Sequence, residues 1–348
     1  MKSMLYMKTG SYRVVSCEGG DQCGKADAIL GFLKKFEERG VSITYSSFPI
    51  YASPFGTVIR KFLKNGLSDF NFDQKDELKI KMALYALDRL QFLDVILQNP
   101  DYKETLVVLD RSSFSNAVTL AYGVVYMKDL TDKELNSLVR YALWLDNLMI
   151  KKLHLEKCVI QMLSEADVWE NVRHEDMDIN ENVEIQRVTD EMYELYEERV
   201  GIGWKKIVTK TNRGWNDRNK IFNDIYNFVV SRHGEFNLEV FPKKYTINIQ
   251  EILKNSYPDA VVDQEDVDKY LKALNENDKD TMHEYGIKIG EQIGKSAGRF
   301  VFKSEEVQEK FCRIIKKEPD ILLVLEKYLD RNFKDIVMKS VDKWTNRS

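Results

Sequence analysis

The sequence has little cysteine and little histidine, with four of each among its 348 residues. The cysteines (Cys17, Cys23, Cys158 and Cys312) are scattered, and neither they nor the histidines show the spacing of a metal site. Such sparse, unpatterned cysteine is typical of proteins from a reducing compartment. It excludes a disulfide framework and a zinc site of the usual spacing.

The sequence also lacks an excess of basic residues and a long apolar run. It has 52 Lys and Arg against 56 Asp and Glu, a formal net charge of −4, which argues against nucleic acid as a partner. No apolar segment near the N-terminus has the length of a signal peptide or a membrane helix. With 43% hydrophobic residues, the chain is expected to be globular, cytoplasmic and long enough for two domains.

A glycine-rich turn lies between a short β-branched run, Val14-Val15, and a helical pattern. Its spacing, Gly19-x4-Gly24-Lys25, is that of a loop that binds phosphate with backbone N–H groups and the helix N-terminus. Ala26 stands where such loops carry a Ser or Thr whose hydroxyl coordinates Mg²⁺. Because Mg²⁺ keeps several water ligands, a water can take this place, at a cost on the order of 10²–10³ in rate.

Strand and helix patterns alternate over the first two thirds of the chain, which predicts a parallel sheet with right-handed crossovers. The predicted strands are 14–15, 41–47, 105–110, 157–163 and 204–209, and the predicted helices are 26–38, 57–63, 74–97, 135–150, 167–172, 184–199 and 217–231. The run from Thr105 to Asp110 is apolar up to its final acid, as in a strand buried on both faces. The loop after it, which starts at Arg111, is where open α/β sheets bind ligands.

A second region of about residues 240–348 follows a first domain of residues 1–235 and is almost entirely helical in pattern. Gly286, Gly290, Gly294 and Gly298 are spaced by four and therefore lie in one row on a helix. Such a row lets another backbone approach closely, and its charged neighbours argue for a soluble helix contact rather than a membrane dimer. We expect a helical domain that packs on the first domain or joins two copies of the chain.

Four ordered segments resemble thymidylate kinases. Cys17 to Lys25 resembles their phosphate loop, and Phe48-Pro49 followed by Ser53-Pro54-Phe55-Gly56-x3-Arg60 resembles the segment after their second strand. Asp88-Arg89 resembles their substrate-binding arginine, and Asp110-Arg111 with the following Ser115 resembles their Asp-Arg motif. The resemblance covers about residues 10–232 and implies a three-layer P-loop NTPase fold with a five-stranded parallel sheet.

The resemblance also implies a role for each matched residue. The donor nucleotide would be bound by Gly19, Gly20, Asp21, Gln22, Cys23, Gly24, Lys25, Ala26 and Asp27. The acceptor would be bound by Asp21, Phe48, Pro49, Arg60, Arg89, Arg111, Ser115 and Tyr122. Lys25, Asp110, Arg111 and Arg173 would form the catalytic set, with Asp110 holding Mg²⁺ through water and Arg173 as the best lid arginine.

The implied activity is transfer of the γ-phosphoryl group of ATP, with Mg²⁺, to a deoxynucleoside monophosphate such as dTMP. Ala26 and an arginine-poor lid leave a second hypothesis open, a degenerate kinase that binds nucleotide or serves as a scaffold. A third hypothesis is a kinase acting on a modified deoxyuridylate or on a base in DNA, against which the acidic net charge counts.

Overall fold

The computed structural model describes residues 11–21, 23–127, 129–165, 183–201, 203–211, 213–234, 244–246, 249–276 and 278–346. Its strands are β1 (Arg13–Glu18), β2 (Ile43–Ser47), β3 (Leu106–Asp110), β4 (Val159–Ser164), β5 (Trp204–Thr211), β6 (Gly214–Trp215) and β7 (Lys244–Thr246). They form one sheet in the order β6-β5-β4-β1-β3-β2-β7. All neighbouring strands are parallel except β5 and β6. The result is an α/β fold with a mostly parallel sheet, consistent with a P-loop kinase-like fold.

The sheet is wider than the five strands expected from the sequence. The five central strands are the predicted ones, and the short strands β6 and β7 extend the two edges. These strands span two and three residues, which is too short for the alternating pattern that identifies a strand in a sequence. β7 comes from the second region and pairs with β2, so the two predicted regions share one sheet.

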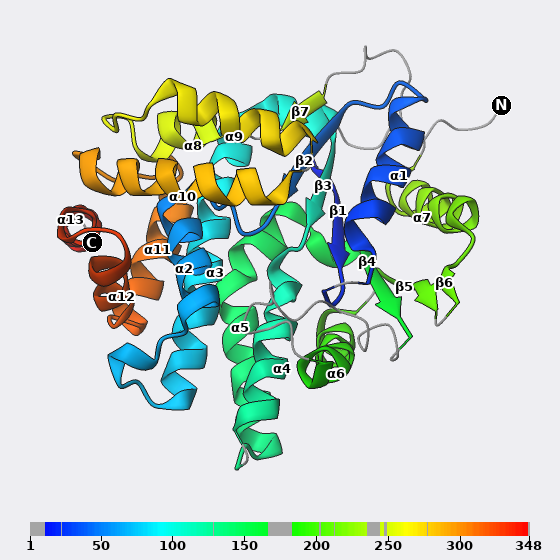
Figure 1. Cartoon of the computed structure of the whole chain (residues 1–348), viewed down its shortest axis with the longest axis horizontal. Coiled ribbons are helices and arrows are strands. Elements are labelled where there is room, and N and C mark those ends of the chain that lie inside the picture. Colours follow the sequence, from blue (N-terminus) through cyan, green and yellow to red (C-terminus); the bar gives the residue numbers. More distant parts are fainter. Residues whose placement is uncertain are drawn as a thin grey trace.

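Helices α1 (Lys25–Glu37) and α7 (Arg218–His233) cover one face of the sheet (Figure 1). In α1 the apolar residues Ile29, Phe32, Leu33 and Phe36 fall on one side at helical spacing, and all four are buried. They pack with the inward side chains of β1, β3 and β4. This packing fixes the direction in which the first turn of α1 points, at the C-terminal edge of the sheet.

The opposite face carries α3 (Gln74–Gln98), α4 (Asn116–Tyr126), α5 (Asp132–Leu153) and α6 (Val183–Val200). α5 begins with a capping box between Thr131 and Glu134, as their spacing predicts. α3 is buried on nearly all sides, including its charged residues Asp88 and Arg89. It has no solvent-facing stripe because further helices cover the side away from the sheet.

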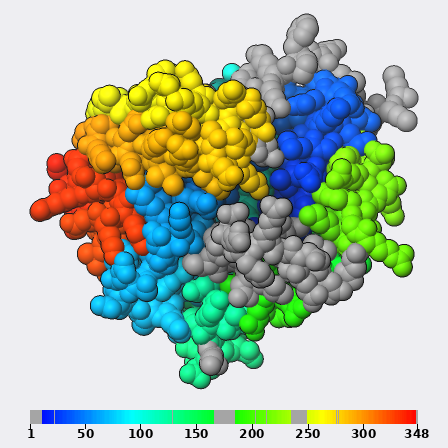
Figure 2. Space-filling view, in the orientation of Figure 1, coloured from blue at the N-terminus to red at the C-terminus, as the bar shows by residue number. Residues whose placement is uncertain are grey.

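The covering helices are α2 and the helices of the second region. α2 (Pro54–Asn65) starts after the cap residue Ser53, whose side chain accepts a hydrogen bond from the backbone N–H of Gly56. The others are α8 (Ile249–Ser256), α9 (Gln264–Glu276), α10 (Lys279–Ser296), α11 (Glu305–Lys317), α12 (Ile321–Tyr328) and α13 (Arg331–Thr345). Figures 1 and 2 show them gathered on one side of the molecule, away from α1 and α7.

The second region and the first region share a hydrophobic core. Phe55 of α2 lies among Phe300, Phe311 and Phe333, with ring centroids 5.8–6.2 Å away. All four rings are buried, so α2 is sandwiched between the sheet layer and the second region.

Part of the row of glycines on α10 packs against the start of α2 and the residues just before it. A Cβ on Gly286 would lie 3.2 Å from the backbone of Tyr51, and one on Gly290 would lie 2.8 Å from Cβ of Thr57. Gly294 and Gly298 are less crowded, with the nearest atoms at 3.5 Å and 3.7 Å. The first two glycines thus allow α10 to approach the start of α2 closely, as the spacing predicts.

Candidate functional site

The predicted phosphate-binding loop, residues 19–25, follows β1 and ends at the first residue of α1. Gly19 has φ +139° and Gly24 has φ +77°, and both values favour glycine. A Cβ on Gly24 would also lie 2.8 Å from the ring of Trp215 in β6. The thiol of Cys23 donates to the Gly20 carbonyl at 3.2 Å, and the Thr209 hydroxyl donates to the Cys23 carbonyl. An anion at the start of α1 would meet the positive end of the helix.

Lys25 and Asp110 form an ion pair at the C-terminal edge of the sheet. Lys25 is the first residue of α1, Asp110 is the last residue of β3, and Nζ lies 2.8 Å from Oδ1. Burial alone would raise the pKa of Asp110, but the charges of Lys25 and Arg111 hold that pKa below its ordinary value. Asp110 therefore stays a carboxylate at neutral pH, and Lys25 has an acidic partner when no phosphate is present.

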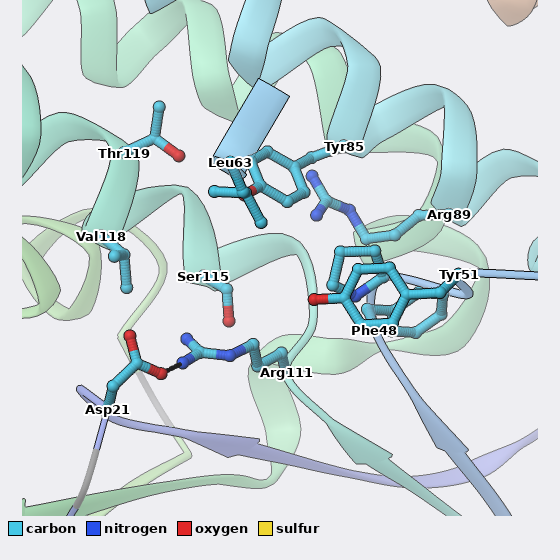
Figure 3. Close-up of a pocket in the computed structure, with 11 residues that line it drawn as sticks. Asp21, Phe48, Tyr51, Leu63, Tyr85, Arg89, Arg111, Ser115, Val118 and Thr119 are labelled. Carbon is cyan, nitrogen blue, oxygen red and sulfur yellow. Dashed lines mark hydrogen bonds and ion pairs between the residues drawn. The ribbon is translucent and has the colours of Figure 1, made fainter. Parts of the chain in front are cut away.

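A pocket opens beside this pair, with about 580 Å³ of empty space including its mouth. Its lining comes from the predicted phosphate-binding loop, the segments after β2 and β3, and helices α2, α3 and α4 (Figure 3). The lining residues are Asp21, Phe48, Pro49, Tyr51, Leu63, Tyr85, Arg89, Arg111, Ser115, Val118 and Thr119. Six of them, Asp21, Phe48, Pro49, Arg89, Arg111 and Ser115, are residues that the sequence assigned to acceptor binding. The pocket combines apolar and aromatic walls with two guanidinium groups, which suits a planar ring that carries an anion.

Arg111 lies between the pocket and the phosphate-binding loop. Its Nη2 donates to Oδ1 of Asp21, and its Nη1 donates to the Gly19 carbonyl at 3.4 Å. The backbone of Arg111 has φ +68°, a value uncommon for a residue with a side chain, and strain of this kind gathers at functional sites. Asp21 in turn accepts from Nε2 of Gln186 at 3.3 Å, and the backbone N–H of Asp21 donates to Oε1 of Gln186 at 2.9 Å. α6 is thereby tied to the loop.

Glu18 is the centre of a buried hydrogen-bond network next to Arg111. It is fully buried and accepts hydrogen bonds from the hydroxyls of Ser112 at 2.5 Å, Ser115 at 2.5 Å and Tyr193 at 3.1 Å. Burial raises the pKa of Glu18, while these hydrogen bonds and Arg111 act in the opposite direction. The network connects β1, the loop after β3 and α6, so it fixes the positions of Arg111 and Ser115.

Arg89 reaches the pocket from α3 and is held by a buried acid on α5. Its Nε and Nη2 donate to the two oxygens of Asp146 at 2.8 Å and 2.6 Å, and both side chains are at most 3% exposed. Although burial opposes a charge on Arg89, the Asp146 carboxylate raises the pKa of Arg89. This two-point pairing sets the plane of the guanidinium group that lines the pocket (Figure 3).

Asp88, next to Arg89 on α3, shapes the segment that follows β2. Its carboxylate accepts from the backbone N–H of Ile50 at 2.8 Å and from the Ser53 hydroxyl at 2.7 Å. Burial raises the pKa of Asp88 to about 6. Through these bonds Asp88 fixes the segment that carries Phe48 and Pro49, two residues of the pocket wall.

Several residues proposed from the sequence lie elsewhere or outside the described ranges. Arg60 on α2 places its guanidinium 5.9 Å from the ring centre of Tyr51 and does not line the pocket itself. Tyr122 on α4 does not line the pocket either, and its ring lies 4.1 Å from Nζ of Lys81. Gln22 and Arg173 lie outside the described residues. Asp27 is exposed in the first turn of α1.

The residues near Asp110 fit a magnesium ion held mainly by phosphates and water. Among the described residues no cluster of three His, Cys, Asp or Glu has the arrangement of a metal site. The hydroxyls of Tyr45 and Ser47 lie 3.4 Å and 3.5 Å from Oδ2 of Asp110 and donate weakly to it. Mg²⁺ bound with a nucleotide needs only one or two carboxylates besides the phosphates, and Asp110 would supply one.

Sequence reasoning missed part of the pocket wall and the residues behind it. Tyr85 lies one helical turn before Arg89, a spacing that places both on one face of α3 and would have identified it. Asp146 and Gln186 are 57 and 165 residues from their partners Arg89 and Asp21, so no local pattern reveals them. Over the described ranges, none of the helices is long and apolar enough to span a membrane.

Comparison with known proteins supports a relationship to thymidylate kinases. No protein-family model matches the chain. A thymidylate kinase from Prochlorococcus marinus (strain MIT 9515) is 28% identical to the chain over 111 residues, 32% of this chain. The match spans about half of that relative, 53% of its length. A solved structure of thymidylate kinase from Candida albicans aligns with a TM-score of 0.42 and 15% identity, over 64% of this chain and 93% of that one.

Proposed function

We propose that this protein is a nucleoside monophosphate kinase that transfers the γ-phosphoryl group of ATP to a deoxynucleoside monophosphate, with dTMP as the acceptor. The observation that carries this proposal is the position of Lys25 and Arg111. Both lie at the C-terminal edge of the sheet, Lys25 on Asp110 and Arg111 in the adjacent pocket. Such a pair of cations stands between a donor and an acceptor phosphate.

The reaction asks the protein for charge and alignment rather than covalent chemistry. An oxygen of the acceptor phosphate forms a bond to the γ-phosphorus of ATP while the bond to the bridging oxygen breaks, which yields two nucleoside diphosphates. Lys25 and the N-terminus of α1 would stabilise the charge on the transferred group, and Arg111 would hold the acceptor phosphate. Mg²⁺, held by the nucleotide phosphates and through water by Asp110, would neutralise further phosphate charge.

The rest of the pocket supports a nucleotide acceptor. Phe48 and Tyr85 provide aromatic surfaces for a base, and Arg89 provides donors in a fixed plane at its edge. Sequence similarity to a thymidylate kinase supports the pyrimidine acceptor.

A coupled assay with ATP, Mg²⁺ and a panel of nucleoside and deoxynucleoside monophosphates tests the proposal. We expect turnover with dTMP that is lost in a Lys25→Ala variant. The proposal fails if no monophosphate is phosphorylated faster than in that variant.

A specific observation favours a second candidate, a nucleotide-binding protein without turnover. Ala26 leaves the first turn of α1 without the hydroxyl that a Ser or Thr would supply. Nucleotide binding that does not depend on Mg²⁺, measured by calorimetry together with absent turnover, would support this candidate. Efficient turnover would remove it.

A further inference from the structure

Helix α10 of the second region contacts Tyr51, a residue of the pocket wall. A Cβ on Gly286 would lie 3.2 Å from the Tyr51 carbonyl carbon, so the two backbones are close. His283, three residues earlier on the same helix face, packs its ring edge-on to the Tyr51 ring with centroids 4.6 Å apart. Figure 3 shows the other end of Tyr51, the hydroxyl, directed into the pocket. α10 therefore contacts both the backbone and the ring of a pocket-lining residue.

The first turn of α10 also brings a positive charge to the same place. Lys279 is exposed, starts α10 and lies one turn before His283, on the face that meets Tyr51. Because it starts the helix turn that leads to His283, Lys279 lies at the end of α10 that contacts the pocket wall through Tyr51. Figure 1 shows this end of α10 toward the middle of the molecule.

The surroundings of His283 keep its ring neutral. Burial, with the charges of Arg60 and Lys279, lowers the pKa of His283 to about 4. His283 therefore acts on Tyr51 through packing, not through charge. Arg60, whose guanidinium lies 5.9 Å from the Tyr51 ring centre, supports the ring from α2.

We propose that α10 completes the acceptor site: His283 is a positioning residue for Tyr51, and Lys279 adds a positive charge that attracts the phosphate of a nucleoside monophosphate. The inference rests on the proposed function, because the ligand of this pocket is taken to be that monophosphate. It assigns the second region a role in substrate binding. It also places a cation at a site whose expected lid offers only one candidate arginine, Arg173.

The experiment measures binding of dTMP alone to the full-length protein by calorimetry, and KM and kcat in the coupled assay. The variants are Lys279→Met, His283→Ala and His283→Phe. The matched control is Lys295→Met, which removes an exposed charge at the far end of the same helix. Thermal unfolding of each variant checks that it is folded.

We expect Lys279→Met to raise Kd and KM for dTMP about fivefold to tenfold with little change in kcat. This loss shrinks in 0.5 M KCl, because salt screens an exposed charge. His283→Ala raises the same constants about threefold to tenfold, and His283→Phe restores them because the ring contact with Tyr51 is kept.

The outcomes separate this inference from the proposed function. If the unaltered protein binds and phosphorylates no monophosphate, the proposed function fails. If the unaltered protein binds dTMP while Lys279→Met and His283→Ala bind it as tightly as Lys295→Met does, the role of α10 is wrong and the proposed function stands. Lys279 is exposed, so its substitution does not threaten folding and the test remains decisive.

Discussion

The ammonium nitrogen of Lys25 lies 2.8 Å from a carboxylate oxygen of Asp110, and the two side chains are only 11% and 12% exposed. The pair joins the start of α1 to the end of β3, so it spans the edge at which a nucleotide would bind. If the proposed function holds, a phosphate that enters the loop would compete with Asp110 for Lys25. The ion pair would then hold Lys25 near the transferred group before substrate binds.

Replacing Lys25 by Met is expected to lower kcat by about 10²–10³-fold or more, because a preorganised charge on the transferred group is lost. Binding of dTMP alone should change little, since Lys25 does not line the acceptor pocket. The coupled assay and calorimetry measure the two effects. Lys34→Met, an exposed change on the same helix, is the control, and equal activity of the two variants would contradict the role of Lys25.

Restoring a hydroxyl at position 26 is expected to raise kcat. Ala26→Thr supplies the missing magnesium ligand, and the gain should approach about 10²-fold at low Mg²⁺. Ala26→Val has the same shape without the hydroxyl and is the matched control. Kinetics over a range of Mg²⁺ concentrations would show a lower Mg²⁺ requirement for Thr only. A similar response to Thr and Val would mean that the hydroxyl does not coordinate the metal here.

Much of this site could be predicted from the sequence because its residues occur in short, local patterns. Gly19 to Lys25 and Asp110-Arg111 each place chemistry at the end of a strand, and parallel strands bring their C-terminal ends to one edge. Helices such as α1 were also predictable from apolar spacing, as Ile29, Phe32 and Phe36 illustrate. The helix predicted at 167–172 lies outside the described residues.

The remaining features depend on contacts between residues far apart in the chain. Asp146 pairs with Arg89 across 57 residues, and His283 contacts Tyr51 across the boundary between the two regions. The strand β7 is three residues long, and only its pairing with β2 makes it a strand. No periodicity encodes such partners, because each is selected by the folded arrangement and not by its neighbours in sequence.

The glycines of α10 are expected to differ in their tolerance of a methyl group. Gly290→Ala would force a Cβ to within 2.8 Å of Cβ of Thr57, so we expect a loss of roughly 1–3 kcal/mol in unfolding free energy. Gly294→Ala meets nothing closer than 3.5 Å and should stabilise the helix by up to about 1 kcal/mol. Urea unfolding of both variants tests this. Equal effects would show that the close approach of α10 to α2 is wrong.

His233 makes stability depend on pH. Its ring is buried at the end of α7 and its Nε2 lies 3.0 Å from the Val14 carbonyl, with Nε2–H as the donor in the neutral ring. Burial lowers its pKa from 6.5 to about 4. Between these values the unfolded chain takes up a proton that the folded protein does not, so stability is lost as pH falls from 6.5 to 4, by roughly 3 kcal/mol.

His233→Gln removes this titration but keeps a side-chain N–H for the Val14 carbonyl. Other groups titrate in the same range, and Asp88, whose pKa is raised to about 6, acts in the opposite direction. The relevant quantity is therefore the difference in unfolding free energy between the two proteins at pH 7 and pH 4.5. A difference that does not change with pH would contradict the assignment to His233.

Arg89 and Asp146 are expected to stabilise the fold only as a pair, so that removing one charge lowers the unfolding free energy more than removing both. Asp146→Asn leaves a buried guanidinium without its countercharge and should cost about 3–5 kcal/mol of unfolding free energy. The double variant Arg89→Met, Asp146→Leu removes both charges from the same buried space and should be less destabilised than Asp146→Asn. It should nevertheless bind dTMP poorly, because the pocket has lost the donors of Arg89. Urea unfolding and calorimetry separate these two effects. A double variant that regains stability and also binds dTMP normally would show that Arg89 serves the fold alone.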